Sequence, residues 1–405
     1  MKRISKCIIV LLLTVIISGC APTSSPATGG ATAQAPTVTA TLSTAVTPTV
    51  TPTVTAESKG VENLIIIIGD GMGQAHISAA QQVYGRHYGF TDWDSTLINT
   101  NAINEQGEAS VLTDSAAAAT AMATGVLTLR RRVGMDKDET VLTTFLDLAR
   151  QKGMVTGILT TETLLGATPA GFSAHVKNRF DPQEVFDSQI DSGVDLLCGA
   201  PDPICAANRE QILQAGYYYC DDISGIDAEP SKKQYWQLDT LKTSPEVEPV
   251  SLAELSVAAL DHLDAKGEFI MIIEQAHIDK FCHDNIFDRT VHSVDMLNST
   301  VERVMEWVGE RTDTAVMVLA DHETGGLVLD PEAENSYFSP ITGEQIAYEY
   351  TSTNHTTDEV KLFWHGFEPN IAALPYFGER DRIKNSDIFY MVCELLELKA
   401  GAEGK

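Results

Sequence analysis

The run Leu64-Ile65-Ile66-Ile67-Ile68 leads directly into Gly69-Asp70-Gly71, so that a carboxyl group follows a wholly apolar segment. Three further apolar runs end in the same way, at polar residues that can take part in chemistry. Short runs of this kind are typical of strands that are buried on both faces, as in parallel sheets. The predicted strands are Leu64–Ile68, Val155–Leu159, Phe269–Ile273 and Ala315–Leu319.

Segments with a helical pattern lie between these strands, and they are Ala116–Thr124, Leu142–Lys152, Leu252–Lys266 and Val291–Val308. Alternating strands and helices predict a doubly wound α/β fold, in which a mostly parallel central sheet is sandwiched by helices. Such folds bind their ligands at the carboxyl ends of the strands. Residues 198–250 show no such pattern, and we expect an irregular excursion on the surface there.

The first residues are typical of an export signal, because a basic start precedes the apolar run Ile8–Ile17. This run is too short to cross a membrane as a mature helix, and Ser18-Gly19-Cys20 after it resembles a bacterial lipobox. We interpret residues 1–19 as a lipoprotein signal peptide and Cys20 as the lipid anchor; the alternative is an ordinary secretory signal. The lipid would hold the exported protein on the bacterial cell envelope, with its folded domain outside the cytoplasm.

Residues 20–58 consist mainly of Thr, Pro, Ala, Ser and Val, a composition that predicts a disordered tether. A strand of alternating Thr and Val is the alternative, and the repeated prolines weigh against it. Residues 59–400 remain for a single α/β domain, the predicted catalytic domain.

The chain carries 56 acidic and 28 basic residues, a formal net charge of −28. A surface of this sign argues against nucleic acid and against an anionic membrane surface as partners. It does not exclude an anionic substrate, because bound metal ions and a single arginine can set the charge of a site locally.

Seven cysteines are present, of which Cys7 leaves with the signal peptide and Cys20 would carry the lipid. An exported protein can form disulfides, and Cys205–Cys220 and Cys198–Cys205 are two candidate pairs between which the sequence does not decide. An odd number remains, so at least one cysteine stays unpaired within the chain, and Cys282 is a candidate. The remaining cysteines are Cys198, Cys205, Cys220, Cys282 and Cys393.

The segment Gly69-Asp70-Gly71-Met72-Gly73 has the glycines of a dinucleotide-binding loop, but the third comes one residue too early. An aspartate would also face the pyrophosphate. An aspartate at the end of a buried strand suits a metal ligand better. The alternative is a turn whose Asp70 caps the following helix.

The segment Thr113-Asp114-Ser115-Ala116-Ala117 begins an alanine-rich stretch whose composition strongly favours a helix. Ser115 then lies at the helix N-terminus, where free N–H groups and the helix dipole favour a phosphate. A hydroxyl in that place is a candidate nucleophile, and it is equally an ordinary N-cap.

Acidic and histidine side chains cluster after two of the other predicted strands. In Glu274–His283, Asp279 and His283 are four residues apart and would project to one side of a helical turn. Asp321-His322 follows another strand, and His355 lies further along the chain. Mixed Asp and His ligands suit Zn²⁺, whereas all-oxygen sets suit Mg²⁺.

Several motifs occur in the order seen in alkaline phosphatases, and together they cover about residues 62–370. They are Asp70 after its strand, T-D-S-A-A at 113–117, A-T-P-A at 167–170, A-H-V-x-x-R at 174–179, E-x-x-x-I-D-x-x-x-H at 274–283, A-D-H at 320–322 and H-T at 355–356. Each motif alone is weak, but their order is highly specific. The chain therefore resembles the alkaline phosphatase family, which implies hydrolysis of small-molecule phosphate monoesters through a phosphoserine on Ser115.

The resemblance also implies two Zn²⁺ ions and one Mg²⁺ ion. One zinc would be held by Asp279, His283 and His355. The other would be held by Asp70, Asp321 and His322. The magnesium would share Asp70 and take Thr168 and Glu274.

By the same resemblance, Arg179 would grip two phosphate oxygens with its planar guanidinium, and Asp114 would orient Arg179. Lys280 would touch the phosphate through water. The pattern departs at Gly166, where relatives have Asp or His, so that one side chain near the magnesium is missing. The resemblance leaves the formation of a homodimer open.

Two other functions are compatible with parts of this pattern. One is a phosphodiesterase or sulfatase of the same superfamily. Sulfatases need C/S-x-P-x-R, and diesterases usually have a Thr nucleophile and lack the arginine, whereas this chain has Ser115 and Arg179. The other is a silent metal- or phosphate-binding lipoprotein, which would require a lost ligand, and none of the implied ligands is lost.

Overall fold

The computed structural model describes residues 60–239, 250–375 and 382–399. The predicted signal peptide (1–19) and tether (20–58) lie outside the described residues, as do both ends of the predicted catalytic domain (59–400). None of the helices in the described ranges combines the length and the apolar character that crossing a membrane requires.

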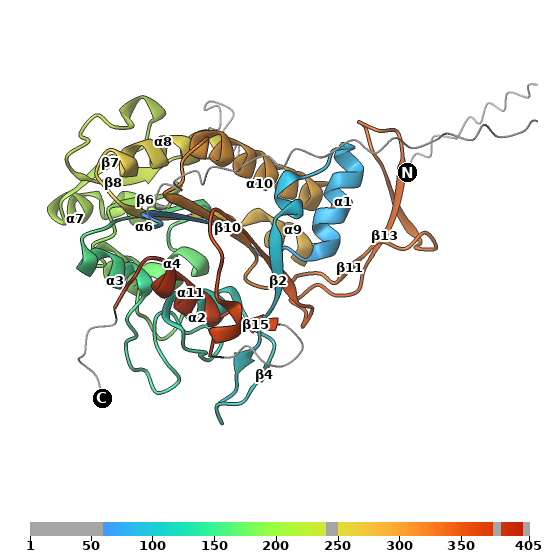
Figure 1. Ribbon diagram of the computed structural model, residues 1–405, viewed down its shortest axis with the longest axis horizontal. Coiled ribbons are helices and arrows are strands. Elements are labelled where there is room, and N and C mark those ends of the chain that lie inside the picture. The colour runs from blue at the N-terminus through green and yellow to red at the C-terminus, as the bar shows by residue number, and fades with distance from the viewer. Residues whose placement is uncertain (1–59, 240–249, 376–381, 400–405) are drawn as a thin grey trace, which may run out of the picture. The chain divides into compact units, whose positions relative to one another are not determined.

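The strands form one large sheet and two small ones. In chain order they are β1 (Asn63–Gly69), β2 (Asp94–Asn99), β3 (Ala102–Ile103), β4 (Ala109–Val111), β5 (Val155–Thr163), β6 (Leu196–Ala200), β7 (Tyr217–Cys220), β8 (Lys233–Gln237), β9 (Phe269–Gln275), β10 (Thr314–Leu319), β11 (Leu327–Val328), β12 (Asn335–Phe338), β13 (Gln345–Tyr350), β14 (Val360–His365) and β15 (Arg382–Lys384). The large sheet has the order β15-β2-β14-β10-β1-β9-β5-β6-β8-β7 (Figure 1). Its pairs are parallel except for those of β14, which runs antiparallel to β10 and β2. The small sheets are β11-β13-β12 and β3-β4.

Strand β1 lies in the middle of the sheet and is buried along its whole length. Ile67 of β1 is paired with Val318 of β10 on one side and with Ile273 of β9 on the other. Each of the four predicted strands is present, with bounds that differ by a few residues. The predicted doubly wound, mostly parallel fold is confirmed.

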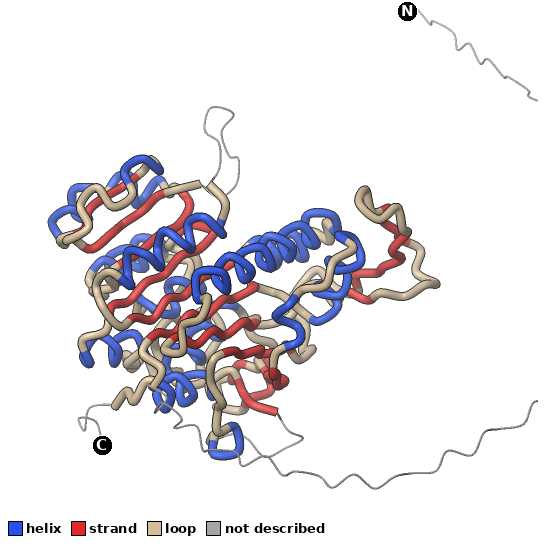
Figure 2. The backbone as a smooth tube through the Cα atoms, turned by 45° about the horizontal axis from the view of Figure 1, so that its top comes forward, coloured by secondary structure: helices blue, strands red, loops and turns tan. Residues whose placement is uncertain are grey.

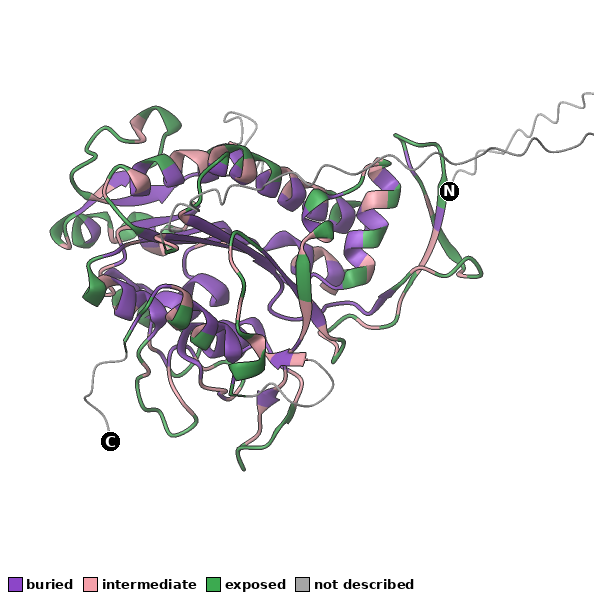
Figure 3. Cartoon of the chain, viewed as in Figure 1, coloured by how far each residue is buried: buried purple, intermediate pink, exposed green. Residues whose placement is uncertain are grey.

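Helices cover both faces of the sheet (Figure 2). They are α1 (Gln74–Tyr84), α2 (Ser115–Thr124), α3 (Phe145–Lys152), α4 (Ala167–Ser173), α5 (Pro182–Ile190), α6 (Pro203–Ala207), α7 (Arg209–Gln214), α8 (Leu252–Asp264), α9 (His277–His283), α10 (Phe287–Val308) and α11 (Asp387–Leu395). Helices α1, α8, α9 and α10 form one layer, and α2, α3, α4 and α11 form the other. Figure 3 shows that the middle strands of the sheet are almost entirely buried, while strand β2 is only partly buried and the outer sides of the helices are largely exposed.

The predicted helices are all present, although α3 begins later than the expected Leu142. The side chain of Thr144 caps this helix, because its Oγ1 accepts the N–H of Asp147 at 3.1 Å. The Asp147 carboxylate accepts the N–H of Thr144 in return, at 2.8 Å. This capping box fixes the first turn of α3 at Phe145.

The expectation of an irregular excursion at residues 198–250 is wrong for the greater part of residues 198–239, and residues 240–249 lie outside the described residues. Strands β7 and β8 and the greater part of β6 lie within it and extend one edge of the sheet. Tyr217, Tyr235 and Trp236 are almost completely buried there. The rings of Tyr217 and Tyr235 pack edge to face with their centroids 5.8 Å apart. Aromatic side chains thus supply the core that the aliphatic pattern did not reveal.

The cysteines of the described residues are all free, so neither candidate disulfide, Cys205–Cys220 or Cys198–Cys205, is formed in the structure. Cys282 is buried and unpaired, as expected. Burial raises the pKa of Cys282 well above its usual range, which keeps the thiol neutral.

Candidate active site

The carboxyl ends of neighbouring strands carry the predicted site residues. Asp70 follows β1, Asp321 comes soon after β10, and Glu274 lies near the end of β9. The N–H of Asp70 donates to the carbonyl of Gln275 at 3.1 Å, which continues the pairing of β1 and β9 past the end of β1. Residues that are about 250 positions apart in sequence (Asp70 and Asp321) therefore meet at one edge of the sheet.

At the N-terminus of α2, the residue that caps the helix is a different one from the predicted nucleophile. Asp114 is the N-cap, because its Oδ1 accepts the N–H of Ala117 at 3.1 Å. Ser115 is the first helical residue, and its Oγ lies 3.2 Å from Nε2 of His322. The alternative interpretation of Ser115 as an ordinary cap is therefore wrong. Its hydroxyl faces a predicted metal ligand instead.

Three oxygen atoms converge on Nε2 of His322: Ser115 Oγ at 3.2 Å, Asp321 Oδ2 at 3.2 Å and Asp70 Oδ1 at 3.5 Å. Both carboxylate oxygens are buried without a hydrogen-bond partner among the described residues. One ring nitrogen has at most one proton to donate, so it cannot satisfy three oxygens, whereas a cation between them could. The donor atoms therefore fit a metal ion.

The backbone holds this group in place. Asp321 Oδ1 accepts the N–H groups of Gly71 at 3.1 Å and of His322 at 2.9 Å, which leaves Oδ2 for the site. Gly71 has a φ of 73°, and a Cβ there would lie 2.8 Å from the Cα of Asp279. Only glycine lets these two segments approach so closely. Helix α1 is capped by Gly73, so the alternative interpretation of Asp70 as a helix cap is wrong.

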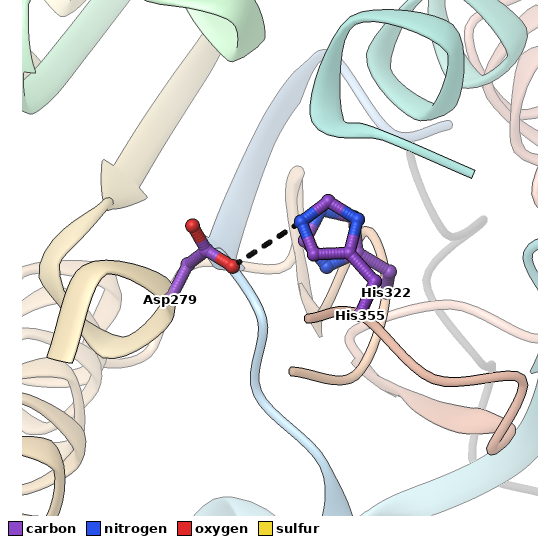
Figure 4. A group of neighbouring side chains, drawn as sticks. All are labelled: Asp279, His322 and His355. Atoms are coloured by element: carbon purple, nitrogen blue, oxygen red, sulfur yellow. Dashed lines mark ion pairs between the residues drawn. The ribbon is translucent and has the colours of Figure 1, made fainter. Parts of the chain in front are cut away.

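A second group surrounds Asp279. Asp279, His322 and His355 each offer one ligand atom, and these atoms lie within 4.8 Å of one another (Figure 4). Asp279 Oδ1 is 3.6 Å from Nε2 of His355 and 3.4 Å from Nε2 of His283. The second distance confirms that Asp279 and His283 project to one side of α9. The two predicted zinc groups adjoin, since the rings of His322 and His355 stack with their centroids 3.7 Å apart.

Backbone carbonyls orient the histidines of the second group. His283 Nδ1 lies 2.7 Å from the carbonyl oxygen of Thr353, and His355 Nδ1 lies 2.9 Å from that of Thr113. A neutral imidazole that donates from Nδ1 keeps Nε2 unprotonated, which is the form that binds a metal. Both rings therefore turn Nε2 towards Asp279.

The predicted magnesium ligands Glu274 and Thr168 lie near each other. Glu274 Oε2 accepts a hydrogen bond from the hydroxyl of Thr160. Burial raises the pKa of Glu274, and the nearby hydroxyl of Thr168, on α4, partly offsets this rise. The Thr168 hydroxyl is buried and has no hydrogen-bond partner among the described residues. Gly166 caps α4, and a Cβ there would lie 3.4 Å from Oε2 of Glu162. The carboxylate of Glu162 thus lies where the missing side chain would point.

The two remaining predicted site residues are paired with carboxylates. Lys280 Nζ forms an ion pair with Glu162 Oε1. Arg179 Nη1 lies 3.7 Å from Asp114 Oδ2, the carboxylate that caps α2. The expected link between Asp114 and Arg179 is therefore present as a loose ion pair.

Burial dominates the electrostatics of the site. It raises the pKa of Asp70 well above its usual range, and the nearby carboxylates of Asp321 and Asp279 raise it further. It raises the pKa of Asp321 to about 8 and that of Glu274 to about 7.

Burial lowers the pKa of His322 well below its usual range, and the charges of His355, His283, Arg179 and Arg130 act in the same direction. Neutral imidazoles beside crowded carboxyl groups favour a divalent cation, which stabilises the carboxylate form.

Comparison with known proteins agrees with this geometry. The family model described as "Alkaline phosphatase" matches residues 61–197 and 227–387, which together make up well over half of the chain. This chain belongs to the alkaline phosphatase family. Membership makes it a hydrolase, and the family acts on small phosphate esters with bound metal ions.

Alkaline phosphatase 4 of Bacillus subtilis is 28% identical over 72% of this chain and 68% of its own length. The alkaline phosphatase of Escherichia coli is 26% identical over 84% of this chain and 87% of its own length. The solved structure of the alkaline phosphatase from the Antarctic bacterium TAB5 has a TM-score of 0.70 at 22% identity, and it covers 85% of this chain and 100% of that one. The structural likeness shows that this chain has the alkaline phosphatase fold.

Some supporting residues of this alkaline phosphatase-family chain were not among those predicted. Thr324 Oγ1 donates to Asp279 Oδ1 at 2.6 Å and lies 3.2 Å from Nδ1 of His322, so it links the two metal-ligand groups. A lone threonine gives no signal in a sequence. Glu162 did carry a signal, because it lies at the end of an apolar run, as the ligands do.

A buried cluster behind the ligands was also missed. His76 Nε2 lies 3.2 Å from Sγ of Cys282 and 3.8 Å from Oε1 of Glu323. Cys282 and Glu323 directly neighbour two of the predicted ligands in sequence, so the cluster ties their segments together. His76 comes from α1, and nothing in the sequence relates it to them.

Proposed function

We propose that this chain hydrolyses phosphate monoesters through a phosphoserine on Ser115. The main support is the placement of Ser115 Oγ, which is free of capping and lies 3.2 Å from the ring nitrogen on which two buried carboxylates converge. The open N–H groups at the start of α2 favour the phosphoryl group at the same place.

We assign the metal ligands as the family resemblance implies. Asp279, His283 and His355 would hold one Zn²⁺, Asp70, Asp321 and His322 a second, and Asp70, Thr168 and Glu274 a Mg²⁺. The unsatisfied buried oxygens of Asp70, Asp321 and Thr168 support this assignment. When bound, these cations would supply positive charge that stabilises the charge developing on the reacting oxygens.

The residues of the chain have distinct roles in the proposed reaction. Ser115 Oγ loses its proton, attacks phosphorus and displaces the alcohol of the ester, which leaves after gaining a proton. Arg179 binds two of the other phosphoryl oxygens with its guanidinium fork. Water then cleaves the bond between Oγ and phosphorus, which restores the Ser115 hydroxyl and releases inorganic phosphate. Lys280 would contact the phosphate through water while it pairs with Glu162.

Replacement of the nucleophile tests this proposal. Ser115→Ala should retain bound metal and lose turnover of an aryl phosphate by about 10³-fold or more. Ser110→Ala, an exposed serine on β4, is the matched control and should keep full activity. Undiminished turnover in Ser115→Ala would end the assignment. Parallel rates on a diester and a sulfate ester would reveal either of the other superfamily activities.

Chelation tests the metal assignment. A chelator should abolish activity, and Zn²⁺ with Mg²⁺ should restore it, because mixed Asp and His sets favour zinc and the Glu–Thr–Asp set favours magnesium. Metal analysis of the purified protein gives the bound ions directly. Restoration by Co²⁺ or Ca²⁺ alone would contradict the assignment.

We propose further that the chain is an exported lipoprotein anchored at Cys20, with its catalytic domain outside the cytoplasm. The apolar run Ile8–Ile17 and the lipobox-like Ser18-Gly19-Cys20 support this proposal. Cys20→Ala should release the protein from the membrane fraction, whereas Cys7→Ala should not. Release by neither substitution, with no lipid found on the mature N-terminus, would contradict it.

A further inference from the structure

Three consecutive arginines, Arg130-Arg131-Arg132, lie between α2 and α3 in a chain with twice as many acidic as basic residues. Arg132 forms an ion pair with Glu139, whose carboxylate lies 3.2 Å from its guanidinium and also pairs with Lys177. Within the described parts of the chain, no carboxylate forms an ion pair with the side chain of Arg130 or Arg131, and both residues are exposed. Their positive charges are therefore available to a ligand.

The backbone of Arg131 is strained and fixed beside the nucleophile. Its φ of 71° lies in the left-handed region, which favours glycine over a long side chain. Its N–H donates to both carboxylate oxygens of Asp114 at 3.1 Å, and its carbonyl accepts the N–H of Arg179 at 2.9 Å. A side chain that is kept in a conformation suited to glycine indicates a use for that side chain.

The arginine side chains share one side of the site. The guanidinium carbons of Arg131 and Arg179 lie 5.5 Å and 5.7 Å from the ring centre of Phe180, which is 67% exposed. Arg131 thus extends the positive charge of the predicted phosphate site outwards, and the exposed Arg130 directly precedes it in the chain.

We propose that Arg130 and Arg131 form a second anion subsite, and that the preferred substrates are phosphate monoesters that carry a second phosphate group, such as sugar bisphosphates. The inference rests on the proposed function, since Ser115 and Arg179 would hold the phosphate that reacts. The other phosphate would lie against Arg130 and Arg131, whose planar guanidinium groups match its oxygens.

A pair of substrates tests this proposal: fructose 1,6-bisphosphate and fructose 6-phosphate. The wild-type chain should show the higher kcat/KM on the bisphosphate. Arg130→Ala combined with Arg131→Gly should lower the ratio of the two kcat/KM values about fivefold to tenfold, the effect of two partly exposed ion pairs. Glycine suits the backbone at position 131 and retains its N–H, so loss of folding would not explain the change. Arg132→Ala, from the same loop, should leave the ratio as in the wild type.

An unchanged ratio in the double variant would overturn the subsite, as would an equal fall on both substrates, which indicates general attraction of anions. Absence of turnover of both sugars by the wild type would count against the proposed function alone. Calorimetry on Ser115→Ala then decides the subsite without turnover. Fructose 1,6-bisphosphate should bind Ser115→Ala more tightly than it binds Ser115→Ala combined with the double variant. Equal affinity would overturn the proposal.

Discussion

The ammonium group of Lys280, which we propose contacts the phosphate through water, is paired with the carboxylate of Glu162. Glu162→Gln would leave this ammonium without its counter-charge. We expect inhibition by inorganic phosphate to tighten about twofold to threefold, because the pair is partly exposed and its interaction is correspondingly modest. Inhibition constants for phosphate give the measurement.

Glu229→Gln is the control for this substitution, since Glu229 also pairs with a lysine, Lys232, but is exposed and belongs to no part of the site. It should leave phosphate inhibition unchanged. Weaker inhibition in Glu162→Gln would show that the carboxylate supports phosphate binding and would refute the expectation.

Single residues were predictable where their chemistry is restrictive. Asp70, Asp321 and His322 follow predicted strands and are types that bind metals, and the structure brings them together. Their roles as ligands stay predictions. Partners such as Thr324 and Arg131 were not predictable, because their contacts depend on how distant segments pack, and a threonine or arginine serves many purposes elsewhere.

Helices α2 and α4 carry Ser115 and Thr168 and pack closely through small residues. A Cβ added at Gly171 of α4 would lie 2.5 Å from the Cβ of Ala119 and 3.1 Å from the backbone of α2. Gly171→Ala should therefore force the helices apart, lower the free energy of unfolding by about 1–3 kcal/mol and reduce kcat. Urea unfolding and initial rates give the measurements.

Gly89→Ala is the matched control, because a Cβ there meets nothing within 4 Å. It should change neither stability nor rate. Wild-type stability in Gly171→Ala would mean that the two helices have room to separate, and that their contact does not position Ser115.

At the scale of elements, the sequence was most informative for the buried parallel strands. A short run of isoleucine and leucine such as that of β1 is typical of a strand that is buried on both faces. Strands β7 and β8 were not predicted, because polar and aromatic residues interrupt their apolar pattern, as in Lys233–Gln237. These strands are stabilised by aromatic rings that are buried when the chain folds, and the periodicity of a short segment does not reveal such contacts.

The whole molecule should respond to pH through its buried carboxyl groups. In the folded chain the pKa is raised to about 8 for Asp321 and to about 7 for Glu274, whereas unfolded carboxyl groups titrate near 4. Between these values the folded chain holds protons that the unfolded chain has lost. The stability of the chelated protein should therefore fall as pH rises through the folded pKa values.

Buried histidines oppose this trend only at lower pH. Burial lowers the pKa of His76 to about 4, whereas histidine in the unfolded chain titrates near 6.5. Between these two values the unfolded chain holds the extra proton, so His76 makes the folded state more stable as pH rises.

From about pH 6.5 to 8 we expect the free energy of unfolding of the chelated protein, measured in urea, to fall by roughly 1–2 kcal/mol. Added Zn²⁺ and Mg²⁺ should reverse the sign, because metal and protons compete for the carboxylates. Stability of the chelated protein that rises with pH would contradict the expectation.

The class of the whole fold followed from the alternation of elements, but the strand order did not. Strand β1 pairs with β9 and β10, whose residues come more than 200 positions later, and only the complete set of packed helices selects these neighbours. The reversed strand β14 likewise has no signature in its own residues.

The division between Asp114 as cap and Ser115 as the first helical residue has an evolutionary consequence. Because the carboxylate of Asp114 satisfies α2, the side chain at position 115 can change with little effect on the amount of folded protein. Asp114 also binds the backbone of Arg131 and pairs with Arg179, so its loss would reduce abundance and, under the proposed function, turnover as well. Under the proposed function, selection would act on position 115 through catalysis and on position 114 through catalysis and folding together. In a lineage that no longer needed the reaction, the serine would be free to drift long before its neighbour.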